Sequence, residues 1–462
     1  MSKFQKTVVI DVVGLSSGLI GEHTPFLKQW AAKRLLRSIE PMLPAVTCSV
    51  QATYLTGKYP TDHGIVANGW YFSEECEVKF WRQSNKLVQS PKIWEAAKAK
   101  DPNFSCANMF WWYNMYSSAD YSVTPRPQYA ADGRKIPDVY SQPAALRDDL
   151  QKELGQFPLF NFWGPNTSIV SSQWIANASK WVDEKYDPTL TLIYSPHLDF
   201  NLQRHGPDHL SISKDLLEID AVCADLIQFY ESRGAEVIVL SEYGISAVNK
   251  PVFLNRILRE AGYLAIREES GGELLDPGAS KAFAVADHQL AHIYVNDPSI
   301  LAAVAALLKN VEGVELLLNE EGKKSYHLAH ERSGDLVAVA DADSWFAYYY
   351  WFDDKKAPDF ARTVDIHHKP GYDPVEMFVD PNIPFPMPLI GWKLLKKKMG
   401  FRTLLDVIPL DASLVKGSHG RLGDDSREHP IIICNPGLQK ERDSLPAVDV
   451  YQLIMDHLEV RE

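Results

Sequence analysis

The alternation of short apolar strands with longer amphipathic helices constrains the fold of this chain more than any other feature. Four short runs rich in β-branched residues are predicted to be buried strands: residues 8–10, 190–194, 237–240 and 431–433. Apolar residues at helical spacing predict helices at three places: residues 27–35, 216–230 and 450–458. This alternation is typical of a parallel sheet covered by helices. We therefore predict an α/β fold with a mostly parallel central sheet flanked by helices.

The length of 462 residues indicates more than one ordinary domain, or one large domain with insertions. Two stretches differ in composition from the strand–helix pattern around them, and we interpret both as insertions that form a cap over the sheet. The predicted segments are core residues 1–102, an aromatic-rich cap insertion at 103–172, core residues 173–267, a second cap insertion at 268–399 and core residues 400–462.

The charge balance bears on which partners the chain can bind. Sixty acidic residues against 47 basic ones give a net charge of −13, so we expect no nucleic-acid polymer as a partner. Such a balance is compatible with an acidic cleft that holds metal cations. The basic stretch at 392–402 is predicted to be a solvated helix face and not a membrane contact. The sequence indicates no particular oligomeric state.

The cysteines and the N-terminal residues bear on the compartment. Five cysteines, an odd number, are widely spread and form no CxxC motif, which favours a reducing environment over a disulfide framework. The first residues resemble no signal peptide, and no run of eighteen apolar residues occurs. We therefore expect a cytoplasmic protein.

Three carboxylates follow predicted strands. Asp11 comes directly after the first strand, Asp199 five residues after the second and Glu242 two residues after the third. Ligands of open parallel sheets bind outside the carboxyl ends of the strands, so these side chains can converge there. Converging carboxylates repel one another unless a cation lies between them, and the pattern therefore predicts a metal site.

The stretch at 44–70 carries a more specific motif. Thr47 is followed by Thr56-Gly57, by Tyr59-Pro60, by His63-Gly64-Ile65 and by Asn68. This order resembles the nucleophile segment of the alkaline phosphatase superfamily. The closest branch is that of the nucleotide pyrophosphatase/phosphodiesterases, with phosphonoacetate hydrolase near by.

The resemblance recurs in the same order along most of the chain. The further matching segments are Asp11 as a first-strand metal ligand, the helix start at 24–27, Asp199 with Gly206-Pro207, residues 241–244, the Gly-Ser-His-Gly stretch at 417–420 and the closing helix at 450–453. It implies an alkaline-phosphatase-like central sheet with an inserted cap. The two insertions lie outside it.

The resemblance also implies a chemistry. It is that of a metal-dependent hydrolase of phosphodiester or nucleotide pyrophosphate bonds, acting on a small phosphorylated substrate through a covalent phosphothreonine intermediate. Thr47 would be the nucleophile, and the side-chain amide of Asn68 would bind phosphate. Cys48 is a competing nucleophile, but no partner histidine is apparent. The alternatives are a phosphomonoesterase or phosphonate hydrolase of the same fold, and a non-catalytic protein that binds a phosphorylated ligand at a degenerate metal site.

The predicted ligand set departs from that of the family, whose usual members hold two zinc ions. The set implied here is Asp11, Thr47, Asp199, Gln203, Glu242 and His419. Gln203 stands where the family has a histidine, and Glu242-Tyr243 stands where it has Asp-His. Fewer imidazoles favour Mg²⁺, Mn²⁺ or a single metal over paired Zn²⁺.

Other histidines could replace the missing ligands. His288 and His368 are the substitutes that we predict. His205, His292 and His367 stay open as further candidates, each with a structural role as the alternative.

Overall fold

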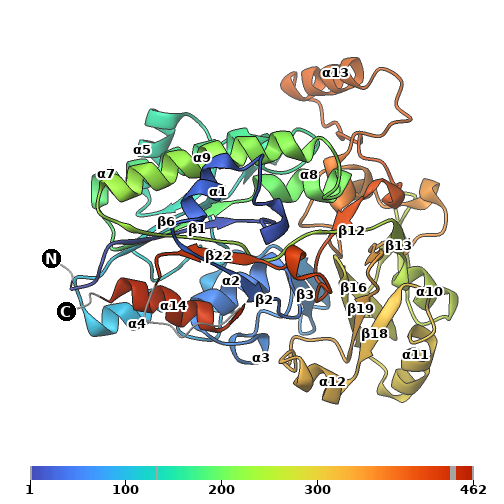
Figure 1. Ribbon diagram of the computed structural model, residues 1–462. Helices are drawn as coiled ribbons and strands as arrows, with labels where there is room; N and C mark the ends of the chain where they lie inside the picture. The colour runs from blue at the N-terminus through green and yellow to red at the C-terminus, as the bar shows by residue number, and fades with distance from the viewer. Residues whose placement is uncertain (1–2, 132–133, 437–443, 460–462) are drawn as a thin grey trace.

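A nine-stranded sheet runs through the centre of the computed structural model, which describes residues 3–131, 134–436 and 444–459 (Figure 1). In spatial order its strands are β23 (Ser444–Pro446), β2 (Leu35–Glu40), β22 (Ile431–Cys434), β11 (Glu236–Leu240), β1 (Thr7–Val12), β10 (Leu190–Ser195), β5 (Cys106–Met109), β6 (Tyr121–Pro125) and β9 (Val139–Gln142). The strands from β11 to β6 are parallel to one another, while β22 and β9 run antiparallel to their neighbours. The predicted mostly parallel sheet is confirmed.

Helices cover both faces of this sheet. Those on one face are α1 (Pro25–Ala31), α5 (Ala145–Leu154), α7 (Ile169–Tyr186), α8 (His197–His205) and α9 (Ile212–Ser232) (Figure 1). Those on the other are α2 (Thr47–Thr56), α3 (Pro60–His63), α4 (Ile93–Lys100) and α14 (Asp449–Leu458). The short α6 (Leu159–Phe162) packs near the start of α7. The strands and helices predicted from the sequence are all present, except that the first helix ends at Ala31 and Leu35 begins β2.

The aromatic-rich segment at 103–172 supplies three strands of the central sheet, β5, β6 and β9. The prediction that this segment caps the sheet is therefore wrong for these strands. Several of its aromatic residues belong to the core: Phe110 and Trp111 are almost wholly buried in the hydrophobic cluster that surrounds the sheet, whereas Tyr116, Tyr129 and Phe160 are exposed. The strands of this segment are short and contain buried polar residues such as Asn108 and Ser122, so they lack the continuous apolar pattern of a buried strand. The aromatic composition was therefore interpreted as that of a lid.

A second sheet lies beside the first, at the right of Figure 1. Its strands are β16 (Ala282–Asp287), β17 (Leu290–Val295), β19 (Leu336–Ala340) and β18 (Val314–Leu318), and it packs with α10 (Leu254–Glu260), α11 (Leu301–Leu308) and α12 (Glu320–Ser325). Two-stranded ribbons complete the fold: β3 (Gly69–Phe72) with β4 (Glu77–Phe80), β7 (Gln128–Tyr129) with β8 (Lys135–Ile136), β12 (Ser246–Ala247) with β21 (Gly417–Ser418), β13 (Lys250–Val252) with β20 (Ser344–Phe346), and β14 (Ile266–Glu269) with β15 (Gly272–Leu275). This region has its own hydrophobic cluster.

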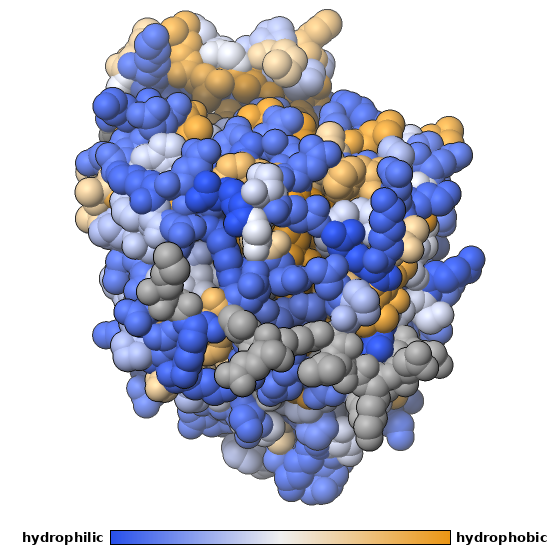
Figure 2. Space-filling model, turned by 60° about the vertical axis from the view of Figure 1, so that its left-hand side comes forward, coloured by the Kyte–Doolittle hydropathy of each residue, from blue (hydrophilic) through white to orange (hydrophobic). Residues whose placement is uncertain are grey.

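Helix α13 (Pro386–Lys398) stands apart from both sheets at the top of Figure 1. None of its residues is buried. Among the described helices, none combines the length and the apolar character needed to cross a bilayer. Figure 2 shows apolar surface gathered at the top of the molecule, the level at which α13 projects.

Candidate active site

Two buried carboxyl groups from adjacent strands form one half of the site. Asp11 lies near the end of β1, opposite Leu240 of β11, and Glu242 follows two residues beyond Leu240. The Gln51 amide on α2 donates from Nε2 to Glu242 and, at 3.4 Å, to Asp11 Oδ2. The backbone N–H of Trp112 fixes this orientation by donating to Gln51 Oε1 at 2.7 Å. We call Asp11, Gln51 and Glu242 the acidic half-site.

The environment of the acidic half-site disfavours two negative charges. Burial raises the pKa of Asp11 to about 7, although hydrogen bonds from its neighbours oppose the shift. Burial and the charge of Asp11 hold the pKa of Glu242 well above its usual range. Two facing carboxyls in such a place must share a proton or bind a cation.

The other half of the site combines a carboxylate, an amide and an imidazole. Asp199 lies in the first turn of α8 and Gln203 one helical turn later, so both side chains share one helix face. Gln203 Nε2 donates to Asp199 Oδ2 at 2.8 Å. His419 Nε2 lies 3.9 Å from Asp199 Oδ1, and burial raises the pKa of Asp199 to about 7. We call Asp199, Gln203 and His419 the histidine half-site.

His419 is held in the tautomer that a metal ligand needs. Its Nδ1 lies 2.7 Å from the carbonyl of Ala45, which can only accept, so Nδ1 carries the proton. Burial lowers the pKa of His419 to about 3, so Nε2 keeps its lone pair at neutral pH. A histidine that binds a metal through one ring nitrogen usually donates a hydrogen bond from the other, often to a backbone carbonyl, and this bond orients the ring.

Aromatic rings enclose His419. Tyr243 stacks on one side with ring centroids 3.6 Å apart, and His288 lies 3.7 Å away with its ring tilted. Tyr372 stacks on His288 and donates its hydroxyl to Gln203 Oε1 at 2.8 Å. Both polar atoms of the Gln203 amide are thus engaged by the protein.

Thr47 lies between the two half-sites. It is the first residue of α2, as the sequence predicts, and its Oγ1 is 2.9 Å from the hydroxyl of Tyr243. Its side chain also lowers the pKa of Glu242, against the larger effect of burial. Tyr243 donates to Asp199 Oδ1 at 3.3 Å, and burial holds the pKa of its phenol well above the usual range. Tyr243 therefore stays neutral and links the hydroxyl of Thr47 to the histidine half-site.

Asn68 lies beside the start of α2. Its Oδ1 accepts a hydrogen bond from the backbone N–H of Cys48 at 3.0 Å, and its Nδ2 donates to Asp287 at 3.1 Å. Asp287, at the end of β16, brings the second sheet against this loop. The thiol of Cys48 is fully buried, and burial raises its pKa well above the usual range, so it stays protonated and unreactive.

The two predicted substitute histidines have different surroundings. His288 follows Asp287 in the turn between β16 and β17, is buried, and has no protein hydrogen-bond partner for Nδ1. His368 has a side chain that is 72% exposed, with Nδ1 2.7 Å from Asp365 Oδ2. The structure places His288 against His419 and leaves His368 at the surface. Of the open candidates, His292 hydrogen-bonds the backbone of Val66 and Gly334.

The side chains present fit a cation, as their unpartnered atoms indicate. Asp11 Oδ1, Glu242 Oε2 and His419 Nε2 are all buried and have no protein donor or acceptor. Buried polar atoms are normally paired, so each of these atoms is available to a ligand. The three atoms do not form a ready cation cage, because among the described residues the group of three such side chains whose ligand atoms all lie within 4.8 Å of one another is a different one. The acidic half-site has only oxygen ligands, which hard cations such as Mg²⁺ and Mn²⁺ prefer.

A second group with metal-ligand chemistry lies outside this site. Among the described residues, His197, Asp215 and Glu218 place ligand atoms within 4.8 Å of one another. His197 Nε2 lies 3.2 Å from Glu218 and 3.5 Å from Asp215, so direct contacts among the three side chains also account for the cluster.

Three residues of the site were missed in the sequence. Gln51 lies four residues after Thr47, and this helical spacing puts it on the face of α2 that carries Thr47, a signal that the sequence contains. Tyr372 and Asp287 come from the region at 268–399, outside the matching motifs, so only the folded chain shows their contacts.

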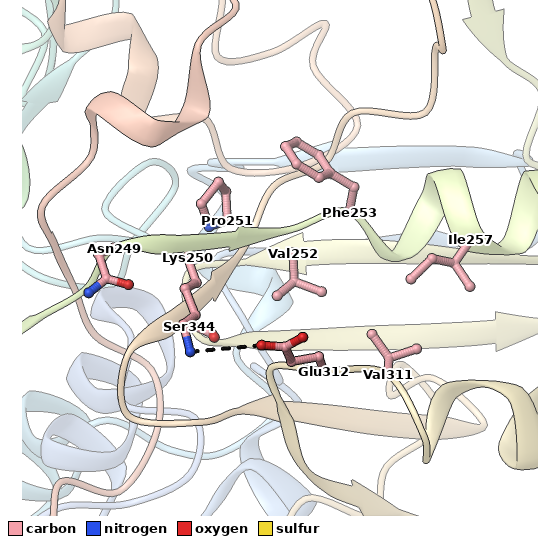
Figure 3. A pocket seen from close by; sticks show the side chains of 9 residues that line it. All are labelled: Asn249, Lys250, Pro251, Val252, Phe253, Ile257, Val311, Glu312 and Ser344. Carbon is pink, nitrogen blue, oxygen red and sulfur yellow. Dashed lines mark ion pairs between the residues drawn. The ribbon is translucent and has the colours of Figure 1, made fainter.

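A cavity of about 640 Å³ opens elsewhere, between β13, α10 and the loop before β18 (Figure 3). Val252, Phe253 and Ile257 form part of its wall, and Lys250 faces Glu312 across it at 3.9 Å. Its lining includes none of the predicted site residues. A much smaller cavity of about 20 Å³ adjoins Tyr243 and His419.

Comparisons with solved structures support the fold. Murine ectonucleotide pyrophosphatase/phosphodiesterase 5, an inactive variant in complex with AMP, matches with a TM-score of 0.60 at 14% identity, over 99% of this chain and 96% of that one. Phosphonoacetate hydrolase from Sinorhizobium meliloti, in complex with phosphonoformate, matches with a TM-score of 0.62 at 15% identity, over 98% and 96% of the two chains.

Two curated fungal proteins are similar in sequence. An uncharacterized pyrophosphatase/phosphodiesterase of Schizosaccharomyces pombe is 25% identical over 269 residues, which is 55% of this chain and 47% of that protein. Ectonucleotide pyrophosphatase/phosphodiesterase 2 of Saccharomyces cerevisiae is 21% identical over 391 residues, or 78% and 68% of the two. The match thus spans about half the length of the first relative.

The family assignment rests on the match to a family profile, which covers most of the chain. The sequence profile of the type I phosphodiesterase/nucleotide pyrophosphatase family matches residues 7–373, from β1 past the turn that carries Asp287 and His288. That span holds Thr47 and every predicted ligand except His419. With the sheet order and the grouping of these side chains, it makes the chain a member of the type I phosphodiesterase/nucleotide pyrophosphatase family.

Proposed function

We propose that the protein hydrolyses phosphodiester or nucleotide pyrophosphate bonds of a small substrate, with a divalent cation and a covalent phosphothreonine at Thr47. The observation that carries this proposal is the position of the Thr47 hydroxyl, at a helix start and hydrogen-bonded to Tyr243, which in turn donates to Asp199. Family membership and the names of the fungal relatives support phosphodiester or pyrophosphate bonds as the bonds that are hydrolysed.

The hydroxyl proton of Thr47 has two routes away from Oγ1. One is the carboxyl of Glu242, whose pKa the Thr47 side chain lowers and which accepts the proton when it is ionised. Tyr243 offers the other route: it takes the proton of Thr47 and passes its own to Asp199 Oδ1. Asp199 suits this role because burial places its pKa at about 7, near the pH of the reaction.

Oγ1, freed of its proton, attacks phosphorus and expels the leaving oxygen, and water then cleaves the phosphothreonine. Backbone N–H groups in the first turn of α2, other than that of Cys48, which donates to Asn68 Oδ1, bind the oxygens of the phosphoryl group. Asn68 contributes the second hydrogen of its Nδ2, because the first is used by Asp287.

A divalent cation would be held by Asp11, Glu242 and Thr47. Asp199 and His419 would be the ligands in the histidine half-site. When bound, it would supply electrostatic stabilisation of the charged oxygens and lower the pKa of the attacking hydroxyl. The oxygen-rich acidic half-site favours Mg²⁺ or Mn²⁺. His288 is our candidate for the missing imidazole, since its Nδ1 is buried without a partner.

The second sheet is the region that we assign to substrate selection. We propose that the insertion at 268–399 is the cap, because its β16–β17 turn delivers Asp287 and His288 to the site. Site chemistry is shared across a fold, whereas the segments around a site set its specificity.

Replacing Thr47 tests the proposal directly. Thr47→Ala should lower the rate of bis-p-nitrophenyl phosphate hydrolysis, measured with Mg²⁺, Mn²⁺ or Zn²⁺, by about 10³-fold or more. Thr56→Ala is the matched control: it makes the same change on the same helix, where Oγ1 donates to the carbonyl of Ala52 and accepts from the backbone N–H of Lys58. Acid-quenched wild-type protein should carry a p-nitrophenyl phosphoryl group on Thr47 in peptide mass spectrometry, because the attack of Oγ1 breaks one of the two ester bonds of this substrate. Full activity of Thr47→Ala would contradict the proposal.

The alternatives give different results in the same assays. Faster hydrolysis of p-nitrophenyl phosphate than of the diester would point to a phosphomonoesterase. Tight binding of AMP, with no hydrolysis of the diester or of p-nitrophenyl phosphate under any divalent cation, would point to a non-catalytic binding protein.

A further inference from the structure

The most exposed apolar surface of the described chain lies on one short segment. We define the projecting segment as residues 385–404, which contain α13 and its flanks. Eight of the eighteen exposed large hydrophobic side chains among the described residues belong to it: Phe385, Met387, Trp392, Leu394, Leu395, Met399, Phe401 and Leu404. Such a concentration on a projecting helix marks an interaction surface.

The apolar residues of α13 lie on two of its sides. Leu389, Trp392 and Leu395 recur at intervals of three residues and share one face. Met387, Ile390 and Leu394 share the opposite face, on which Ile390 packs against the second hydrophobic cluster. Phe385 is 80% exposed and Met387 73%, just before and inside the first turn. Figure 1 shows that no other helix or sheet packs against this element.

The charge of the projecting segment is opposite to that of the whole protein. Five cations lie within it, namely Lys393, Lys396, Lys397, Lys398 and Arg402, and no aspartate or glutamate does. The complete chain has a net charge of −13. A local cationic patch next to an apolar face is complementary to an anionic lipid surface, which offers phosphate and carboxylate groups above hydrocarbon.

We propose that the projecting segment binds the interfacial layer of an anionic lipid bilayer. The sequence alone favoured a solvated helix here, but the exposure of Trp392 and its apolar neighbours argues for burial in lipid. A thirteen-residue helix is about 20 Å long, which is enough to lie along the interface and too short to span a hydrocarbon core of about 30 Å.

A second copy of the chain is a less suitable occupant of this surface. Pairing two projecting segments would bring two sets of five cations together, whereas anionic headgroups neutralise them. Arg402 also ties the segment to the body by donating to the carbonyl of Ala131 at 2.8 Å, so the helix has a defined attachment. Trp392 and its neighbour Lys396, 5.2 Å from the ring, form the aromatic–cationic pair common at bilayer interfaces.

Vesicle flotation of the full-length protein tests this proposal. We expect binding to phosphatidylcholine vesicles that contain phosphatidylserine, weaker binding in high salt and little binding to phosphatidylcholine alone. The double variant Trp392→Asp/Leu395→Asp and the triple variant Lys396→Glu/Lys397→Glu/Lys398→Glu should each reduce binding about tenfold or more. Leu210→Asp is the matched control, because Leu210 is 91% exposed on another loop.

Two outcomes would overturn the proposal. One is absence of wild-type binding to anionic vesicles, or equal binding by the variants, when circular dichroism shows that all proteins are folded. The other is a dimer in analytical ultracentrifugation that Trp392→Asp/Leu395→Asp converts to a monomer without any vesicle binding by the wild type. Binding to double-stranded DNA in place of vesicles would also assign the cations to a different partner.

Discussion

The two half-sites differ in what their side chains still offer to a cation. In the acidic half-site Asp11 Oδ1 and Glu242 Oε2 lack a protein partner, so two ligand oxygens are free. In the histidine half-site both polar atoms of Gln203 are engaged by Asp199 and Tyr372, and only His419 Nε2 is free of a hydrogen bond. Gln203, an amide where the family has an imidazole, thus leaves the histidine half-site with fewer free ligand atoms for a cation than the acidic half-site. We infer that the acidic half-site is the stronger cation site.

The largest effect is expected from a change in the acidic half-site. Glu242→Gln keeps the shape but removes a charged ligand and the proton acceptor of Thr47. We expect bound Mn²⁺ and kcat/KM to fall by more than about 100-fold, since loss of even an outer support of a ligand costs 10- to 100-fold. Gln203→Ala in the histidine half-site should cost less. Equal losses in metal analysis and kinetics would remove the distinction between the halves.

The reverse change should strengthen the weaker half. Gln203→His puts an imidazole one helical turn after Asp199, where it can bind the same cation as Nε2 of His419. We expect the affinity for Zn²⁺, measured by competition with a chelating dye, to rise about tenfold relative to that for Mn²⁺. An unchanged ratio of the two affinities would show that position 203 does not reach a metal.

A smaller effect is expected from the predicted substitute ligand. His288→Ala should lower the metal content of the protein by a fraction of one equivalent, because the ring of His288 lies 3.7 Å from that of His419. His368→Ala is the matched control, since its ring pairs with Asp365 at the surface. Elemental analysis that finds both variants equal to the wild type would leave His288 with a packing role only.

The smallest effect concerns stability and pH. Burial raises the pKa of Asp11, Asp199 and Asp287 to about 7 from the usual 3.8, so the folded protein holds protons that the unfolded chain has lost. The stability of the metal-free protein should therefore fall as pH rises from about 4 to about 7. Mn²⁺ should restore the Tm more at pH 8 than at pH 5. A Tm that rises with pH in this window without metal would contradict these shifts.

The sequence predicted the parts of the site that depend on local pattern. Asp11 and Glu242 follow buried strands, and Thr47 begins a helix, so their position at one edge of the sheet follows from strand order. The contacts of Tyr372 with Gln203 and of Asp287 with Asn68 join segments far apart in the chain, which no local pattern encodes. The aromatic segment at 103–172 was misjudged because buried aromatic residues of a sheet and of a lid have the same composition.

The most direct test of the central claim is the anomalous signal of Mn²⁺ in crystals of the full-length protein. The account predicts a peak within about 2.3 Å of oxygens of Asp11 and Glu242 and of Thr47 Oγ1. A peak only at His197, Asp215 and Glu218, with none beside Thr47, would contradict it.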